Sequence, residues 1–375
     1  MADDEVKARH TSNNAPGDAP YDARLIVVSE EPLNAETPLA EQSGLLTPTP
    51  LFYARNHFAI PALASDSWRL RVGGAVECPL TLTYDDLRAL PAKTLTVTLE
   101  CAGNGRAGLH PPAEGEPWKY AAVSTAAWTG VPLRTVLDLA GAHPQVVEVR
   151  FRGADSGYVA AAQAHISFER SLPIAEATND DVLLAYQMNG EPLPPRHGFP
   201  LRLVVPGWYG MAAVKWLTEI TASLEPFTGF YQADRYIMAH PERGDASARP
   251  LTTMGVRSLI VSPANQATLP ANEPQIIRGL AWSGAAPVER VEVSTDGGVA
   301  WEAAELLDAA TPYAWRRWRL SWQPKRRGSI SIRSRAFDAA GNTQPDEAEW
   351  NRLGYCNNAV QTISVQLVMP DHFPT

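Results

Sequence analysis

"TLECAGNGR" (residues 98–106) joins a strand-like apolar run to a turn of glycines that ends in arginine, with a cysteine at the junction. The same residues begin a G-x-G-x-x-G pattern at Gly103, Gly105 and Gly108, which binds a dinucleotide when it lies between a strand and a helix. The helix must follow the glycines directly, so that its N-terminus faces the pyrophosphate. The residues that come next, LHPPAEGEP (109–117), contain three prolines and prevent a long helix. The sequence therefore argues against a dinucleotide site.

Cys101 is the second feature of this segment. A lone cysteine is most often a buried structural residue. Here the amides of the glycine turn and Arg106 follow directly, and nearby donors and positive charge favour a thiolate. A thiolate serves either as a nucleophile, with a histidine as its base, or as a ligand of a soft metal. The residues of the segment alone leave these alternatives open.

The segments around this turn mix helices and strands. LTVTLE (95–100) alternates as a strand does, LTYDDLRALP (82–91) predicts a short helix, and a second helix is expected between Pro132 and Gly141. VVEVRFRGADSGYVAAA (146–162) predicts strand, turn and strand. No regular alternation of strand and helix runs through residues 46–250, which favours an α+β domain over a doubly wound sheet.

The C-terminal third has a different pattern of apolar and turn residues. From about Val256, short alternating runs are separated by Gly, Pro and Asn turns, and Asp296-Gly297-Gly298 predicts a hairpin. About seven strands in about 115 residues predict an all-β immunoglobulin-like sandwich over residues 251–375. Residues 1–45, rich in Pro, Asn, Ala and acids, predict an extended or partly disordered N-terminal arm.

Composition limits the function classes. The 375 residues are too many for an average single domain and fit two domains better than three. A net charge of -9 argues against nucleic acid as a partner. No apolar run approaches 18 residues, so we expect no membrane span. Three widely spaced cysteines and a polar N-terminus predict a cytoplasmic protein, or a periplasmic one if an export signal was removed.

Four segments, in order and approximate spacing, resemble the sulfite oxidase family: FYARNHFAIP (52–61), TLECAGNGR, LLAYQMNGEPLPPRHGFPLRLVVPGWYGMAAVKWL (183–217) and WNRLGYCNNA (350–359). The resemblance implies a molybdenum–molybdopterin cofactor bound by the α+β domain, with Cys101 as the protein ligand of the metal. An anionic sulfur suits a high-valent metal that changes oxidation state. It also implies that the C-terminal domain dimerises, so we expect a homodimer.

The resemblance carries further roles to positions of this chain. It implies that the cofactor is held by Tyr53, Ala54, Arg55, Asn56, His57, Cys101, Asp155, His197, Arg202, Ala213, Val214 and Lys215. It implies that the substrate pocket is formed by Arg55, Arg106, Trp118, Tyr236 and Arg352. Two positions depart from the family's pattern: Gly105 stands where an arginine is frequent, and Arg352 lies one place earlier than the arginine of many members.

The function implied by the resemblance is oxidation of sulfite to sulfate by oxo transfer at molybdenum. No haem-binding pattern is visible, so we expect no haem domain and a separate electron acceptor: a cytochrome, a quinone-linked protein or oxygen. The alternatives are a related molybdenum enzyme acting on sulfane sulfur, a sulfoxide or nitrate, and a cofactor-free binding protein.

Overall fold

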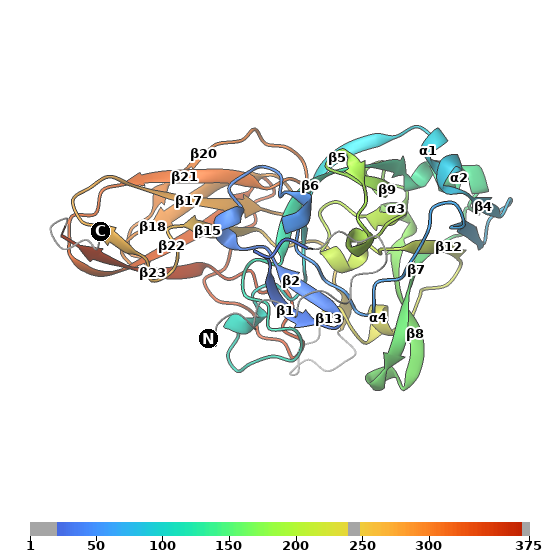
Figure 1. Ribbon diagram of the computed structural model, residues 1–375, viewed down its shortest axis with the longest axis horizontal. Helices are drawn as coiled ribbons and strands as arrows, with labels where there is room; N and C mark the ends of the chain where they lie inside the picture. Colours follow the sequence, from blue (N-terminus) through green and yellow to red (C-terminus); the bar gives the residue numbers. More distant parts are fainter. Residues whose placement is uncertain (1–20, 239–247, 370–375) are drawn as a thin grey trace, which may run out of the picture.

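The computed structural model describes residues 21–238 and 248–369, which form two lobes along the long axis of the molecule (Figure 1). The first lobe holds two five-stranded sheets and short helices, and the second holds two further sheets. In the described part of the chain, no helix is long and apolar enough to cross a membrane. The domain boundaries expected at residues 45 and 250 stay predictions.

One sheet of the first lobe carries Cys101 at the end of its edge strand, in the order β10-β9-β6-β5 with β11 also paired to β9. All its pairings are antiparallel. The strands are β5 (Lys93–Glu100), β6 (Val123–Pro132), β9 (Leu183–Met188), β10 (Glu191–Pro192) and β11 (Arg202–Val204).

The second sheet of this lobe has the order β4-β3-β12-β7-β8, with β3 and β12 parallel and the other pairs antiparallel. Its strands are β3 (Leu70–Gly74), β4 (Leu80–Leu82), β7 (Glu148–Val159), β8 (Ala164–Pro173) and β12 (Leu217–Ser223). The strand–turn–strand prediction for residues 146–162 is wrong. β7 is one strand with a register shift between Arg152 and Ser156, a bulge that sets the direction of Asp155.

The helices are short, and two of them, Tyr84–Ala89 and Leu133–Ala140, lie where the sequence predicted them, whereas the other two were not predicted. Thr83 forms a capping box with Asp86 at the start of one, and Gly141, at a φ of 65°, ends another. The α-helices are α1 (Tyr84–Ala89), α2 (Leu133–Ala140), α3 (Ile174–Ala177) and α4 (Phe230–Ala233). The 3-10 turns are η1 (Leu39–Glu41), η2 (Thr49–Leu51), η3 (Arg106–Gly108), η4 (Ala160–Ala162), η5 (Pro195–His197) and η6 (Gly210–Ala212).

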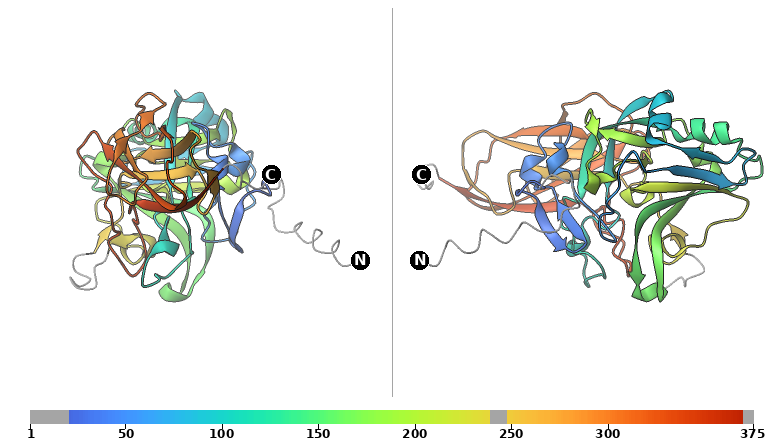
Figure 2. Two further views of the ribbon diagram at one scale, coloured as in Figure 1. Left: turned by 90° about the vertical axis from the view of Figure 1, so that its left-hand side faces the viewer. Right: turned by 45° about the vertical axis from the view of Figure 1, so that its right-hand side comes forward.

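The N-terminal arm expected over residues 1–45 needs correction in its described part. Residues 21–45 contain an antiparallel hairpin, β1 (Ile26–Glu30) and β2 (Leu33–Glu36), near the junction of the lobes (Figures 1 and 2). Asn34 and Gln42 are buried, and the Gln42 amide donates to the carbonyl of Val123 (2.8 Å). Polar composition misled the prediction because these side chains bond to the first lobe instead of water. Residues 1–20 lie outside the described residues.

The C-terminal lobe consists of two sheets in the orders β15-β17-β21-β20 and β16-β23-β22-β18-β19. Trp318, Ile277, Val291 and Ile332 belong to the apolar cluster of this lobe, as expected for packed sheets. The hairpin predicted at Asp296-Gly297-Gly298 is confirmed, because β18 and β19 pair across it. The immunoglobulin-like designation stays a prediction.

The strands of this lobe are β15 (Arg257–Ser262), β16 (Thr268–Pro270), β17 (Gln275–Trp282), β18 (Val288–Ser294), β19 (Glu302–Ala303), β20 (Glu305–Leu306), β21 (Arg316–Trp322), β22 (Gly328–Asp338) and β23 (Gln361–Val368). A small antiparallel pair, β13 (Ile237–Met238) and β14 (Arg249–Pro250), precedes them.

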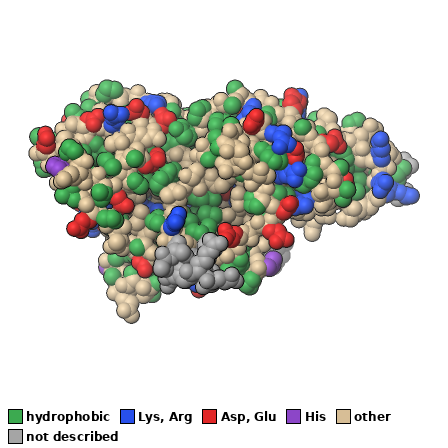
Figure 3. Space-filling view, turned by 180° about the vertical axis from the view of Figure 1, so that it is seen from behind, with side chains coloured by type: hydrophobic (Ala, Val, Ile, Leu, Met, Phe, Trp, Pro, Cys, Tyr) green, Lys and Arg blue, Asp and Glu red, His purple; other side chains and the backbone are tan. Residues whose placement is uncertain are grey.

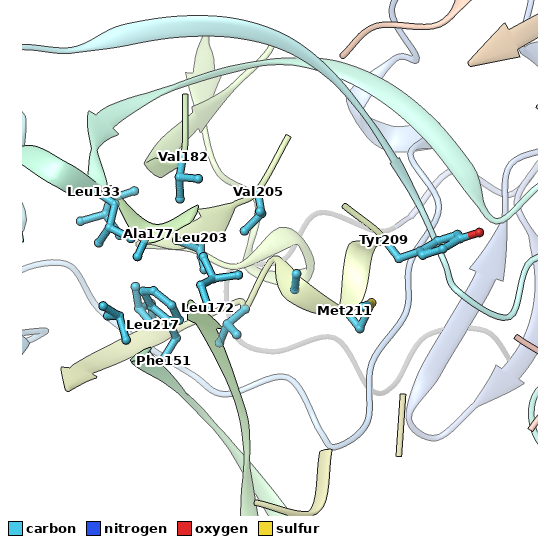
Figure 4. Packing of buried hydrophobic residues seen from close by; sticks show 14 of the residues in the cluster. Leu133, Phe151, Leu172, Ala177, Val182, Leu203, Val205, Tyr209, Met211 and Leu217 are labelled. Carbon is cyan, nitrogen blue, oxygen red and sulfur yellow. The ribbon is translucent and has the colours of Figure 1, made fainter. Parts of the chain in front are cut away.

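The largest apolar core joins the two lobes. In the first lobe, Leu133 from α2, Phe151 from β7 and Leu172 from β8 pack together (Figure 4). The same cluster includes Leu280 and Trp282 of β17 in the C-terminal lobe. The two lobes are therefore held by continuous packing.

Candidate active site

A cavity with about 650 Å³ of space free of protein atoms opens where the ends of β5, the β7 bulge, η5 and η6 meet. It brings together most of the residues that the sequence assigned to a site: Tyr53, Arg55, Asn56, His57, Cys101, Asp155, His197, Arg202, Ala213, Lys215 and Tyr236. Ala54, Arg106, Trp118, Val214 and Arg352 are not among its lining residues.

Several lining residues were missed from the sequence because they carry no polar signal. They are Phe52, Leu99, Ala102, Phe168, Gly210 and Met211. Leu99 follows from the alternation of β5 once Cys101 is placed in the cavity, since residues two apart on a strand share a face. Phe168 and Met211 had no such signal.

Cys101 lies directly after β5, with its backbone N–H donating to the carbonyl of Ala122 (2.9 Å). Its side chain is buried, and burial raises the pKa of the thiol despite the opposing charges of Arg55 and Arg106 and the N–H of Gly103. Arg106 and the Gly103 N–H favour a thiolate, as the sequence predicted, but burial opposes it and has the larger effect. A bound metal would supply the missing charge, since a coordinated thiol is deprotonated outright.

The turn after Cys101 is tight. The N–H of Asn104 donates to the Cys101 carbonyl (2.8 Å), and Gly105 has a φ of 89°, which glycine adopts without strain. A Cβ at Gly105 would lie 2.9 Å from Nη2 of Arg257. The positive φ thus favours a glycine at this position, where the sequence departs from the family's pattern.

The Arg55-Asn56-His57 segment is held by the N-terminal hairpin. Oδ1 of Asn34 accepts from the N–H of Asn56 (2.8 Å) and from Nη1 of Arg55 (3.3 Å). The His57 ring stacks on Phe168, with 4.4 Å between ring centroids. Burial, reinforced by the charges of Arg55 and Lys215, lowers the pKa of His57 well below its usual value, so the ring is neutral near pH 7.

Tyr236 faces His57, and its hydroxyl lies 2.6 Å from Nε2 of that ring. Burial raises the pKa of Tyr236, so the phenol stays protonated. Its backbone φ of 50° is in the left-handed region, which bulky residues rarely occupy outside strained sites. The phenol is therefore held in one orientation at the cavity wall.

Two buried polar atoms of the cavity lack a partner. Oδ1 of Asp155 and Nε2 of His197 make no hydrogen bond among the described residues. Burial raises the pKa of Asp155 to about 7, against the charge of Lys215. Burial also lowers the pKa of His197, assisted by neighbouring cations. Buried polar groups are nearly always bonded, so these two atoms call for a ligand that fills the cavity.

Arg202 and Lys215 form the cationic part of the wall. Arg202 donates to the carbonyls of His197 (3.0 Å) and Ala213 (3.3 Å) and lies over the Trp128 ring. The Lys215 ammonium donates to Oδ1 of Asn56 and to the carbonyl of Arg196 (3.0 Å). These bonds hold both cations in place beside the cavity, as a phosphate site requires.

Arg106 and Trp118 lie behind the cavity wall. Arg106 donates to the carbonyls of Leu353 (2.9 Å) and Glu116 (2.7 Å), and its guanidinium lies over the Tyr355 ring. The Trp118 indole is fully buried, and its Nε1 has no partner among the described residues. Both lie near Cys101, but neither side chain lines the cavity.

Arg352 needs correction as a substrate residue. Its side chain is 57% exposed and pairs with Glu114 at 3.3 Å, so it faces solvent at the surface. Tyr355 of the same segment points inward, with its ring stacked on Tyr236 (5.1 Å between centroids). The arginine that is displaced by one position in the sequence therefore leaves the site, because the chain reverses around Gly354 (φ 61°).

The residues present fit a molybdopterin. The cavity holds one thiol at the end of a rigid strand, two fixed cations suited to a phosphate, and two unpartnered polar atoms, one an acceptor for ring N–H groups. Cys101 would bind the metal, Arg202 and Lys215 the phosphate, and Asp155 and His197 the edge of the ring. These assignments are proposals.

Comparisons with known proteins agree on the family. Residues 57–231 match the family "Oxidoreductase molybdopterin binding domain", and residues 248–368 match "Mo-co oxidoreductase dimerisation domain". The mitochondrial sulfite oxidase of Rattus norvegicus is 38% identical over 366 residues, which cover 92% of this chain and 66% of that protein. The chain thus spans slightly less than two thirds of this relative.

Two further relatives act on other substrates. Inducible nitrate reductase [NADH] 2 of Glycine max is 32% identical over 382 residues, with 92% of this chain and 42% of that protein covered. The solved structure of the sulfane dehydrogenase SoxCD from Paracoccus pantotrophus superposes with a TM-score of 0.79 at 31% identity, covering 96% of this chain and 92% of that one. This chain belongs to the sulfite oxidase family of oxidoreductases, which use a molybdopterin cofactor.

Proposed function

We propose that this oxidoreductase converts sulfite to sulfate at a molybdenum held by Cys101 and passes the electrons to a separate acceptor. The observation that carries the proposal is the shared cavity. Cys101, Arg55 and Tyr236 line the same cavity. The unpartnered atoms of Asp155 and His197 also belong to residues of this cavity. A metal ligand, an anion-binding cation and a hydrogen-bonding phenol are the parts that oxidation of a small oxyanion needs.

The bound cofactor supplies two-electron redox chemistry and an oxygen atom for transfer. Arg55 attracts and orients the oxyanion, because its guanidinium is fixed by Asn34 and its charge is only partly exposed. Tyr236 presents a neutral hydroxyl whose direction is set by His57. Phe52, Phe168 and Met211 exclude water from the wall, which strengthens each charge contact inside.

A sulfane-sulfur substrate is the second candidate. Two observations favour it: Arg352 lies outside the cavity, paired with Glu114, and Gly105 supplies no cation. The pocket is therefore less cationic than the family's pattern implies, which suits a larger or less charged substrate. The similarity to the sulfane dehydrogenase SoxCD points the same way.

The assembly and partners are also proposals. The match of residues 248–368 to a dimerisation domain supports a homodimer. The electron acceptor stays a prediction, with a cytochrome, a quinone-linked protein and oxygen as its alternatives. The cellular compartment also stays a prediction.

The test uses purified protein from a host that makes the cofactor. About one molybdenum per chain, with turnover of sulfite that is lost in Cys101→Ser, supports the proposal. If the protein turns over a sulfane-sulfur compound, a sulfoxide or nitrate but not sulfite, that compound and not sulfite is the substrate. Protein without molybdenum from such a host would contradict the proposal and favour a cofactor-free binding protein.

A further inference from the structure

We propose that the C-terminal lobe positions the metal ligand: Arg257 and Trp282 hold Glu100, the residue before Cys101, and thereby fix the direction of the Cys101 side chain. This inference rests on the proposed function, because it takes Cys101 as the ligand of the metal. It gives the C-terminal lobe a role in the site beyond dimerisation.

The starting point is the alternation of side chains at the end of β5. Leu99 and Cys101 both line the cavity. Glu100 between them points to the other side, as successive residues of an extended chain do, and is only 2% exposed. The side chain next to the proposed metal ligand is thus a buried carboxylate that faces the C-terminal lobe.

Three side chains hold this carboxylate. Nη1 of Arg257 donates to Oε1 at 2.7 Å, and Nε1 of Trp282 donates to Oε2 at 2.9 Å. The amide of Asn104 donates to Oε1 at 2.9 Å. Arg257 and Trp282 are directly opposite each other in the pairing of β15 with β17. One rigid cross-strand pair of the C-terminal lobe therefore binds both oxygens of Glu100.

The same network extends into the turn that follows Cys101. Nη1 of Arg257 also donates to the carbonyl of Asn104 (3.2 Å), whose own N–H donates to the Cys101 carbonyl (2.8 Å). Oδ1 of Asn104 accepts from the N–H of Ala122 (3.2 Å). Cys101 is thus bracketed by two residues, Glu100 and Asn104, that Arg257 contacts directly.

A second segment of the C-terminal lobe closes the turn from outside. Three hydrogen bonds join the two segments: Cys356 N–H to the Ala102 carbonyl (2.8 Å), the Asn357 amide to the Gly105 carbonyl (2.8 Å) and Arg106 Nε to the Leu353 carbonyl (2.9 Å). The turn has no freedom to tilt without breaking contacts to this lobe. The orientation of Cys101 is therefore set by both lobes together.

The consequence is a specific effect on the metal. If Glu100 loses one of its anchors, the β5 end relaxes and the sulfur approaches the metal at a different angle. Supporting residues of metal ligands typically change affinity or activity by about 10- to 100-fold when removed. Arg257 and Trp282 act through Glu100, so they are positioning residues and not catalytic ones.

The test compares two Trp→Phe variants of the holoenzyme. Trp282→Phe removes the bond to Glu100 and keeps an aromatic ring in the core. Trp301→Phe removes an equivalent indole bond, to the carbonyl of Gly298 (3.1 Å), in the same lobe but on the β18–β19 loop. Each protein is measured for molybdenum content, the Mo(V) electron paramagnetic resonance spectrum, kcat and KM, and thermal midpoint.

We expect Trp282→Phe to retain molybdenum, to shift the Mo(V) spectrum and to lower kcat by about 10-fold with little change in KM. Trp301→Phe should keep the wild-type spectrum and kcat. If Arg257→Lys folds, it should shift the Mo(V) spectrum further than Trp282→Phe does. If Arg257→Lys does not fold, Trp282→Phe alone tests the positioning role. A wild-type spectrum and kcat in Trp282→Phe, with only a lowered thermal midpoint, would overturn the inference.

The wild-type protein separates this failure from failure of the proposed function. If wild-type protein holds no molybdenum, or if Cys101→Ser leaves its Mo(V) spectrum unchanged, Cys101 is not the ligand and both proposals fall. If the spectrum depends on Cys101 but not on Trp282, only the positioning role is refuted.

Discussion

Cys101 illustrates how the environment of one side chain restricts its chemistry. Burial raises the pKa of its thiol although two arginines and a backbone N–H act in the opposite direction. A reactive nucleophilic cysteine needs a lowered pKa, so the burial of Cys101 argues against the nucleophile among the alternatives that the sequence left open. Coordination to a metal would deprotonate the thiol despite its burial.

Arg55 and Arg352 provide a matched pair for the substrate role. Arg55→Gln removes the cation that lines the cavity, so we expect KM for an oxyanion substrate to rise by about 10- to 100-fold, the loss of one charge-assisted bond. Arg352→Gln should leave KM within about twofold, since an exposed ion pair contributes little. Steady-state kinetics of the two variants with equal molybdenum content check this. Equal effects of the two substitutions would contradict the assignment.

Asp155 provides a pH prediction for the cofactor-free protein. Its pKa rises from 3.8 to about 7 on folding, so its contribution to stability is present below pH 3.8 and is lost as the pH rises through about 7. Asp155→Asn should remove this loss. Denaturant titration measures the unfolding free energy of both proteins. As the pH rises to about 7, the wild type should lose stability relative to Asp155→Asn, and above about pH 7 the difference should stay constant.

Asp181 is the control of opposite sign for this prediction. Hydrogen bonds from Lys93 and Tyr313 lower its pKa, so its contribution is lost as the pH falls. Asp181→Asn should therefore cost stability near neutral pH and less in acid. If both variants respond to pH alike, the burial of Asp155 does not govern its titration.

The single-residue assignments show what the sequence could predict. The residues of FYARNH, TLECAGNGR and RHGFPLR that converge on the cavity are polar groups in unusual apolar settings, and the resemblance identified them. Arg352 was placed wrongly because it lies in a turn that exposes its side chain and buries the next residue, Leu353. Asn34 was missed because it belongs to a segment whose composition predicted disorder.

The hairpin β1–β2 is an element that completes the site from the N-terminal side. Asn34→Ala removes the acceptor of the Asn56 N–H and of Arg55. We expect a stability loss of about 1–3 kcal/mol, because a buried N–H is left without a partner, and a raised KM, because Arg55 is no longer fixed. Chemical denaturation and steady-state kinetics measure the two effects.

Asn265→Ala is the control for this element. Asn265 also accepts a backbone N–H, from Ser364 at 2.9 Å, but at an exposed position of the C-terminal lobe. It should cost less than about 1 kcal/mol and leave KM unchanged, since water replaces the lost partner. An unchanged KM in Asn34→Ala as well would show that the hairpin only supports the fold.

Among the elements, those with strong local signals were predicted and those set by tertiary contacts were not. The helix after Thr83 and the hairpin at Gly297-Gly298 depend on capping and turn residues that the sequence displays. The bulge in β7 had no such signal. It follows from the pairing with β8 and from the space at Gly153, where a Cβ would lie 2.4 Å from Oδ1 of Asp155.

At the scale of the molecule, the shared core predicts one cooperative unit. Phe151 in the first lobe and Leu280 and Trp282 in the second belong to one apolar cluster, and Glu100 pairs with Arg257 across the junction. We expect a single thermal unfolding transition in calorimetry, because unfolding of one lobe would expose the apolar cluster that both lobes share. Two transitions separated by more than a few degrees would contradict this.

The face of the molecule in Figure 3 carries charged side chains of both signs. On the face in Figure 3, Lys and Arg side chains alternate with Asp and Glu. The net charge of -9 can be counted from the sequence, but this distribution cannot, because folding decides which charges are neighbours. The absence of a nucleic-acid partner stays a prediction.

The central claim is that the sulfur of Cys101 is bonded to molybdenum, and X-ray absorption at the molybdenum edge tests it most directly. Wild-type holoenzyme should show one more sulfur neighbour at the metal than Cys101→Ser with the same cofactor content, and Cys356→Ser should match the wild type. The same number of sulfur neighbours in wild type and Cys101→Ser would contradict the account.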